Sequence, residues 1–122
     1  MRILTIDDNE DITNLLEVVF TSKGYEFAKS NEGREGFKMI LDQKYDVILL
    51  DMAMPEYTGM DIINDLKKIG RLKDQKIIIF TASSATDGEL NKMLENDGIY
   101  TCIRKPVRTK KLLEIVKEII QQ

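Results

Sequence analysis

Apolar residues gather along this chain into short runs that alternate with longer stretches of helical spacing. The runs cover residues 3–6, 47–50, 77–80 and 99–103, with a weaker run at 25–29. The runs at 3–6, 47–50 and 77–80 do not alternate between apolar and polar positions. Such continuous runs are typical of strands that are buried on both faces of a sheet.

Between these runs, apolar residues recur at the spacing of one buried α-helix face. The first such face is expected to comprise Ile12, Leu15, Leu16, Val19 and Phe20. Further faces are expected within 36–41, 62–69, 90–94 and 112–120, and glycines lie where helices should end, at Gly24, Gly70 and Gly98. Five strands that alternate with five helices predict an α/β fold, a doubly wound parallel sheet with helices on both faces.

Acidic residues end two of the predicted strands. Asp7 and Asp8 follow the first strand and Asp51 follows the third. Ligand sites of such sheets lie at the carboxyl ends of the strands, where the strand order reverses. If the strand order is 2-1-3-4-5, the three carboxylates meet at one edge.

Three carboxylates in one pocket repel each other unless a cation is present or their pKa values rise. A hard divalent ion such as Mg²⁺ suits oxygen ligands of this kind. Thr81 ends the fourth strand and Lys105 follows the fifth, so a hydroxyl and an ammonium are expected at the same edge. Three carboxylates, one lysine and one divalent ion sum to zero charge. Such a site is equipped to transfer a phosphoryl group onto a carboxylate.

Four short motifs on successive strand ends resemble one known family. They are the acidic pair at 7–8, the segment LLDMAMPEYTGMD around Asp51, FTA at Thr81, and KP at Lys105–Pro106. Together they resemble the receiver domain of two-component response regulators over almost the whole chain. The resemblance implies a flavodoxin-like (βα)5 fold with the strand order 2-1-3-4-5.

The resemblance also implies a role for each motif. Asp51 would be phosphorylated by a histidine kinase or a histidine phosphotransfer protein, while Thr81 and Lys105 contact the phosphoryl oxygens. Mg²⁺ would be held by Asp8 and Asp51 directly, by Asp7 mainly through water, and by the backbone carbonyl of Ala53. A downstream protein would dock on the face of the fourth helix, fifth strand and fifth helix. The Lys105–Pro106 bond is expected to be cis, as is typical of the family.

Some positions admit other interpretations. Asp7 and Asp8 could simply lead into the first helix, with Asn9 or Asp8 as its N-cap. Arg104 could compete with Lys105 for the phosphoryl group. Receivers often carry an aromatic switch residue where this chain has Cys102; Tyr100 is expected on the same side of an ideal strand.

Composition narrows the function classes. A length of 122 residues fits a single domain, expected here to be one receiver domain over 1–122 without an effector domain. A net charge of −3 gives no basic surface for nucleic acid, and no apolar stretch is long enough to cross a membrane. One cysteine fits a reducing, cytoplasmic location. The absence of histidine excludes Ser-His and Cys-His catalysis.

Two other functions remain open. One is a pseudo-receiver that serves as an interaction module without phosphorylation. The other is a small Mg²⁺-dependent phosphohydrolase with an aspartyl-phosphate intermediate, although Glu10 stands where haloacid-dehalogenase-like enzymes carry an aspartate. We expect no enzyme activity beyond self-phosphorylation and slow autodephosphorylation, in either a stand-alone receiver or a domain of a longer protein.

Overall fold

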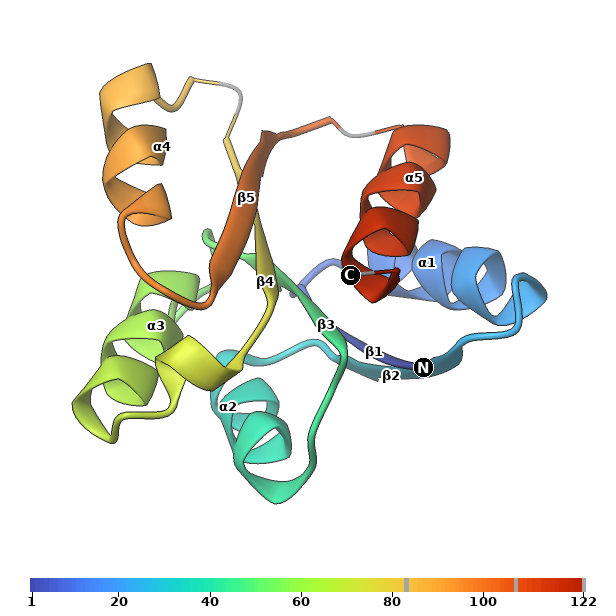
Figure 1. Ribbon diagram of the computed structural model, residues 1–122, viewed down its shortest axis with the longest axis horizontal. Helices are drawn as coiled ribbons and strands as arrows, with labels where there is room; N and C mark the ends of the chain where they lie inside the picture. The colour runs from blue at the N-terminus through green and yellow to red at the C-terminus, as the bar shows by residue number, and fades with distance from the viewer. Residues whose placement is uncertain (83, 107, 122) are drawn as a thin grey trace.

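The computed structural model describes residues 1–82, 84–106 and 108–121 (Figure 1). Within these ranges the strands are β1 (Arg2–Ile6), β2 (Glu26–Ser30), β3 (Val47–Asp51), β4 (Ile77–Thr81) and β5 (Ile99–Arg104). The α-helices are α1 (Glu10–Ser22), α2 (Gly33–Asp42), α3 (Gly59–Lys68), α4 (Asp87–Leu94) and α5 (Thr109–Ile120), with one 3-10 helix, η1 (Leu72–Asp74). The alternation predicted from the apolar runs is therefore confirmed.

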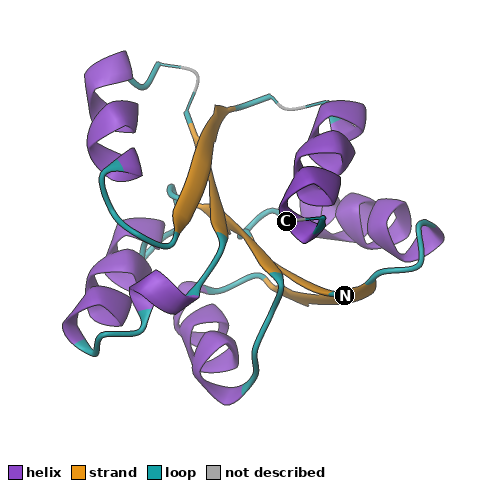
Figure 2. Cartoon of the chain, in the orientation of Figure 1, coloured by secondary structure: helices purple, strands orange, loops and turns teal. Residues whose placement is uncertain are grey.

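The strands form one parallel sheet, drawn in orange in Figure 2. Their order is β2-β1-β3-β4-β5. This is the flavodoxin-like order expected from the sequence. The chain first builds outward from β1 to β2 and then returns to the other side of β1 to add β3. The carboxyl ends of β1 and β3 consequently lie side by side where the order reverses.

Helices cover both faces of the sheet, with α1 and α5 on one face and α2, α3 and α4 on the other (Figure 1). The sheet side chains divide into two separate cores. On the α1 and α5 face the buried core includes Phe20, Phe80 and Val116, while on the opposite face it includes Leu50 and Leu66. Both faces of β3 and β4 are thus buried, which explains their unbroken apolar sequences. In the described chain, no helix combines the length and apolar character needed to span a bilayer.

Two expected buried helix faces are only partly buried. In α1, Leu16 and Phe20 are buried, but the side chain of Leu15 is 53% exposed. Leu15 lies on the flank of α1 beside a groove toward α5, so the sheet does not reach it. Helix α4 lies entirely within the described residues. None of its residues is buried, and Leu94 is 42% exposed. Helical spacing identified the inward faces but overestimated their width.

The expectation that Tyr100 shares a side of the strand with Cys102 is wrong. Ile99 pairs with Ile77 and Thr101 with Ile78, so Tyr100 is an extra residue that forms a β-bulge. Its ring packs with the α1 and α5 core and its hydroxyl donates to Glu118 of α5 at 3.1 Å. Cys102 packs with the opposite core.

Gly98 offers a test of how the α4–β5 turn is built. Its φ is +98°, and an added Cβ would lie 1.9 Å from the carbonyl oxygen of Leu72. We expect Gly98→Ala to lower the free energy of unfolding by about 3 kcal/mol, from left-handed strain plus this overlap.

Gly24→Ala is the matched control, because its φ is +87° with nothing within 4 Å of the added Cβ. Strain alone should cost about 1 kcal/mol there. Urea denaturation of both variants measures the difference. Equal losses would contradict the close approach at Leu72.

Candidate functional site

The carboxylate of Asp51 is buried at the centre of the carboxyl edge of the sheet. Asp51 is the last residue of β3 and is only 2% exposed. Its Oδ1 accepts a hydrogen bond from the backbone N–H of Ala53 at 3.2 Å and lies 3.1 Å from the Nζ of Lys105. A buried carboxylate requires such partners, because losing water without compensation is costly.

Asp7 lies beside it, directly after β1, and is 1% exposed. Its Oδ1 accepts from the N–H of Asn9 at 3.0 Å, and its Oδ2 lies 3.4 Å from the Nζ of Lys105. Asn9 is the N-cap of α1 and accepts from the N–H of Asp11 at 2.9 Å, so Asp8 is not the cap. The start of α1 therefore holds the Asp7 carboxylate in place while Asp8 stays exposed.

Asp7, Asp8 and Asp51 each offer one carboxylate oxygen, and these three oxygens lie within 4.8 Å of one another. This cluster fits a hard divalent cation, which prefers several oxygen ligands and retains water where a ligand is exposed. Ala53 is exposed next to the cluster, two residues beyond Asp51. The three carboxylates of the donor set that the sequence predicted thus converge at one point.

Lys105 links the two buried acids, and their charges determine its protonation. Burial by itself lowers the pKa of Lys105, but the hydrogen bond and charge of Asp51, followed by those of Asp7, outweigh burial and raise it. For Asp7, burial raises the pKa most, and the Asp51 charge adds to that effect. The N–H of Asn9 and the ammonium of Lys105 oppose the increase only in part.

Thr81 and Arg104 lie opposite each other on β4 and β5. Thr81 is 7% exposed, and its hydroxyl is 3.5 Å from the carbonyl oxygen of Ile103, at the limit of a hydrogen bond. Arg104 bonds to the start of α4, whereas Lys105 reaches the two buried acids. The Lys105–Pro106 bond is cis, as expected.

Sequence reasoning missed Asn31. Its side-chain amide donates to the carbonyl oxygen of Asp7 at 2.8 Å and to the hydroxyl of Thr13 at 3.0 Å. Asn31 therefore ties the segment after β2 to the acidic loop after β1. Its position directly after the second strand could have indicated it, because that strand also ends at the same edge of the sheet.

A flavodoxin-like sheet with an acidic, lysine-containing pocket at its strand-order reversal defines a narrow class of α/β proteins. Comparison with known families makes the assignment specific: residues 3–117 match the model of the response regulator receiver domain. This chain belongs to that family and is a receiver domain of a two-component system.

Curated and structural relatives agree with the assignment. The transcriptional regulatory protein DltR of Streptococcus agalactiae is 28% identical over 117 residues, 96% of this chain and 50% of that protein. The chain thus spans about half the length of this curated relative. The receiver domain protein of Clostridium thermocellum is 30% identical with a TM-score of 0.82, covering 98% of this chain and 94% of that one. TrrA of Thermotoga maritima, solved in complex with Mg²⁺-BeF, is 30% identical with a TM-score of 0.80, covering 97% of each chain.

The raised pKa of Asp7 gives a stability test. Below pH 3.8 the carboxyl is protonated in both folded and unfolded states; as pH rises through the raised folded pKa, the folded state loses stability. Without divalent metal at pH 7, we expect Asp7→Asn to raise the free energy of unfolding by about 1 kcal/mol.

The gain should shrink as the pH falls toward 3.8, because Asp7 is then neutral in the wild type too. Urea denaturation across this pH range in EDTA measures it. A gain that does not change with pH, or a loss at pH 7, would show that burial of the Asp7 charge carries no net cost.

Proposed function

We propose that this receiver domain accepts a phosphoryl group on Asp51 from a phosphohistidine of a histidine kinase or a histidine phosphotransfer protein. One observation carries the proposal. The Asp51 carboxylate is buried at the reversal of strand order, paired with Lys105 at 3.1 Å, within 4.8 Å of carboxylate oxygens of Asp7 and Asp8. A carboxylate nucleophile beside a cation and a metal-binding cluster suits phosphoryl transfer.

The reaction exchanges one bond to phosphorus for another. An oxygen of Asp51 forms the new O–P bond, the N–P bond of the phosphohistidine breaks, and the imidazole leaves with the electron pair and takes up a proton. In the described residues, the N–H of Ala53 and the ammonium of Lys105 both contact Oδ1 of Asp51. This arrangement supports Oδ2 as the attacking oxygen.

Lys105 and Thr81 complete the proposed phosphoryl site. The Nζ of Lys105 already lies between Asp7 and Asp51, where it can follow the charge that arrives on the phosphoryl oxygens. Among the described residues, the Thr81 hydroxyl contacts the carbonyl oxygen of Ile103 at 3.5 Å, and so weak a contact would let it turn toward a second phosphoryl oxygen at little cost.

Mg²⁺ fits the acidic cluster as the proposed cofactor. Asp8 and Asp51 would bind it directly, Asp7 mainly through water, and Ala53 through its backbone carbonyl. When bound, Mg²⁺ would neutralise the carboxylates and the incoming phosphoryl charge. The Mg²⁺-BeF complex of the Thermotoga relative supports this choice.

A groove next to the site supports a protein as the phosphodonor. It has a volume of about 470 Å³, and its walls include Asp7 and Lys105 from the site together with Ile12, Leu15 and Pro106. Apolar side chains continuous with the acidic pocket would allow a partner to bury surface while its phosphohistidine reaches Asp51. After phosphorylation, we propose that a downstream protein docks on the face of α4, β5 and α5.

The alternatives find less support. A pseudo-receiver would not require three converging carboxylates and a lysine, and a phosphohydrolase would require a site for a small phosphate ester besides the acceptor. We therefore propose a single receiver domain over 1–122 that turns over no substrate apart from its own phosphorylation and slow autodephosphorylation.

Phosphotransfer from acetyl phosphate or a phosphorylated kinase with Mg²⁺ tests the proposal. We expect one phosphoryl group on the wild type by intact mass and none on Asp51→Asn, because the amide cannot form the aspartyl phosphate. Asp97→Asn, which alters an exposed acid outside the site, should label like the wild type. A stoichiometric label on Asp51→Asn would assign the acceptor elsewhere.

The metal assignment has its own test. Mg²⁺ binding only the folded state should raise the melting temperature of the wild type. Asp8→Asn, which removes a direct ligand, should reduce this increase more than Asp7→Asn, which removes mainly a water-mediated contact. Asp11→Asn in the first turn of α1 is the control for charge alone. An undiminished Mg²⁺ effect in Asp8→Asn would rule out Asp8 as a ligand.

A further inference from the structure

Helix α4 packs only loosely on the domain: Met93 is partly buried against the core, and the thiol of Cys102 lies 4.0 Å from the carbonyl oxygen of Leu90. None of its residues, all within the described chain, is buried, although it lies against β5. A pocket of about 340 Å³ separates part of α4 from the candidate site, with Thr81 and Ala53 on one wall and Leu90 and Met93 on the other. With so little of α4 buried, the contacts that hold its two ends contribute much to fixing its position.

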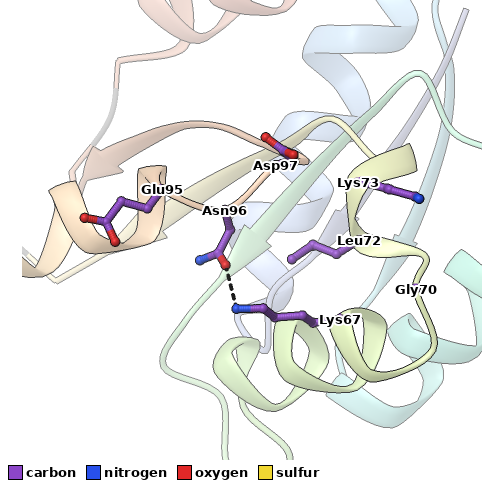
Figure 3. Close-up of a pocket in the computed structure, with 7 residues that line it drawn as sticks. All are labelled: Lys67, Gly70, Leu72, Lys73, Glu95, Asn96 and Asp97. Atoms are coloured by element: carbon purple, nitrogen blue, oxygen red, sulfur yellow. Dashed lines mark hydrogen bonds between the residues drawn. The ribbon is translucent and has the colours of Figure 1, made fainter.

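The C-terminal end of α4 is anchored to the body of the domain. Lys67 of α3 donates from Nζ to the side-chain oxygen of Asn96 at 3.0 Å (Figure 3). Beyond it, Gly98 packs directly against the carbonyl of Leu72 in η1. These contacts lie away from the candidate site.

The N-terminal end of α4 is held by one side chain from the neighbouring strand. Arg104 donates from Nε to the carbonyl oxygen of Ala85 at 3.2 Å, and its guanidinium also pairs with the carboxylate of Asp87. The two contacts together attach both the β4–α4 loop and the first turn of α4 to β5.

Arg104 also lies between the two residues proposed to contact the phosphoryl group. It is the cross-strand partner of Thr81 and the sequence neighbour of Lys105. The N–H of Lys105 donates to the carbonyl of Thr81 at 2.8 Å, which couples the two strand ends. A movement of Thr81 and Lys105 toward a phosphoryl group would therefore shift the strand ends from which Arg104 reaches Ala85 and Asp87.

We propose that Arg104 is a clamp that holds the start of α4 in the position of the unphosphorylated domain, and that phosphorylation of Asp51 releases it. The inference rests on the proposed function and specifies how the signal leaves the site. Cys102 is too small to act as an aromatic switch, and the bulge turns Tyr100 to the other face. Arg104 lies two residues after Cys102, on the same side of β5, and its side chain reaches the start of α4. In this proposal, Arg104 takes over the role of the aromatic switch residue.

The clamp is weak enough to be released. The side chains of Arg104 and Asp87 are 41% and 88% exposed, and ion pairs between exposed groups contribute little. A ligand shifts such an equilibrium only by its difference in affinity for the two states, and the coupling is reciprocal. If phosphorylation opens the clamp, opening the clamp must favour phosphorylation by the same factor.

Beryllofluoride with Mg²⁺, a stable phosphoryl mimic, tests this reciprocity at equilibrium. We expect Arg104→Gln and Asp87→Asn each to bind it a few-fold tighter than the wild type, on the order of fivefold at most for an exposed pair. Loss of positive charge near an anion should by itself weaken binding. Tighter binding of beryllofluoride by Arg104→Gln would therefore be the opposite of the change in affinity that the lost charge alone predicts.

Two further measurements separate the clamp from other roles. The double variant Arg104→Gln/Asp87→Asn should bind like Arg104→Gln alone, because the loss of Arg104 already removes its contact with Asp87 as well as that with Ala85. Arg108→Gln, the same change at an exposed arginine outside α4, should bind no tighter than the wild type. Amide exchange over 84–94 should be faster in both single variants without ligand.

The outcomes distinguish the clamp from the proposed function. If the wild type binds beryllofluoride but neither single variant binds tighter, or if the two effects add, the clamp is wrong while the phosphoacceptor site stands. If the wild type binds no beryllofluoride in Mg²⁺, the proposed function fails and the signalling role of Arg104 fails with it.

Discussion

Among the described residues, the ammonium of Lys105 is the cation that allows two buried carboxylates to share the edge of this sheet. Asp7 and Asp51 are almost fully removed from water, and neither would be tolerated there as an isolated charge. Lys105 lies 98 positions from Asp7 in the sequence and approaches from the end of the edge strand β5. The site is therefore complete only when β1, β3, β4 and β5 have all assembled in the right order.

The same interaction sets a conflict between stability and function. One lysine does not balance three carboxylates, so the metal-free site retains unfavourable charge. Burial raises the pKa of Asp7 most, and the nearby charge of Asp51 raises it further. The cost is tolerable because the rest of the domain is locally consistent. Helices α1 and α3 carry side-chain caps at Asn9 and Thr58, and the sheet is buried on both faces. The unfavourable charge of the acidic site is therefore tolerated because the remainder of the domain is stable on its own.

Much of this architecture could be predicted from the sequence, because unbroken apolar runs indicate buried strands and acids at the ends of such strands are costly unless a partner compensates them. The strand order and the convergence of Asp7, Asp8 and Asp51 are confirmed. The failures have physical causes. Helical periodicity marks a direction but not the reach of the opposing surface, so Leu15 and α4 were expected to be more buried than they are.

Other features cannot be predicted from a pattern of apolar and polar residues. The contacts of Asn31 are a polar interaction across two loops, which no periodicity reports. The direction of Arg104, away from the acids and toward α4, depends on the register of β5. The register of β5 depends in turn on one inserted residue, Tyr100. An inserted residue moves the side chains of the strand that precede it to the opposite face of the sheet.

That inserted residue, Tyr100, has a consequence for how the domain behaves among other molecules. β5 is an edge strand, and an edge presents unpaired N–H and C=O groups to which a strand of another chain can bind. A bulge increases the local twist and interrupts the even spacing of these groups. The irregularity that directs Tyr100 toward α5 therefore also makes β5 a poor template for extending the sheet, and so protects the domain against edge-to-edge aggregation.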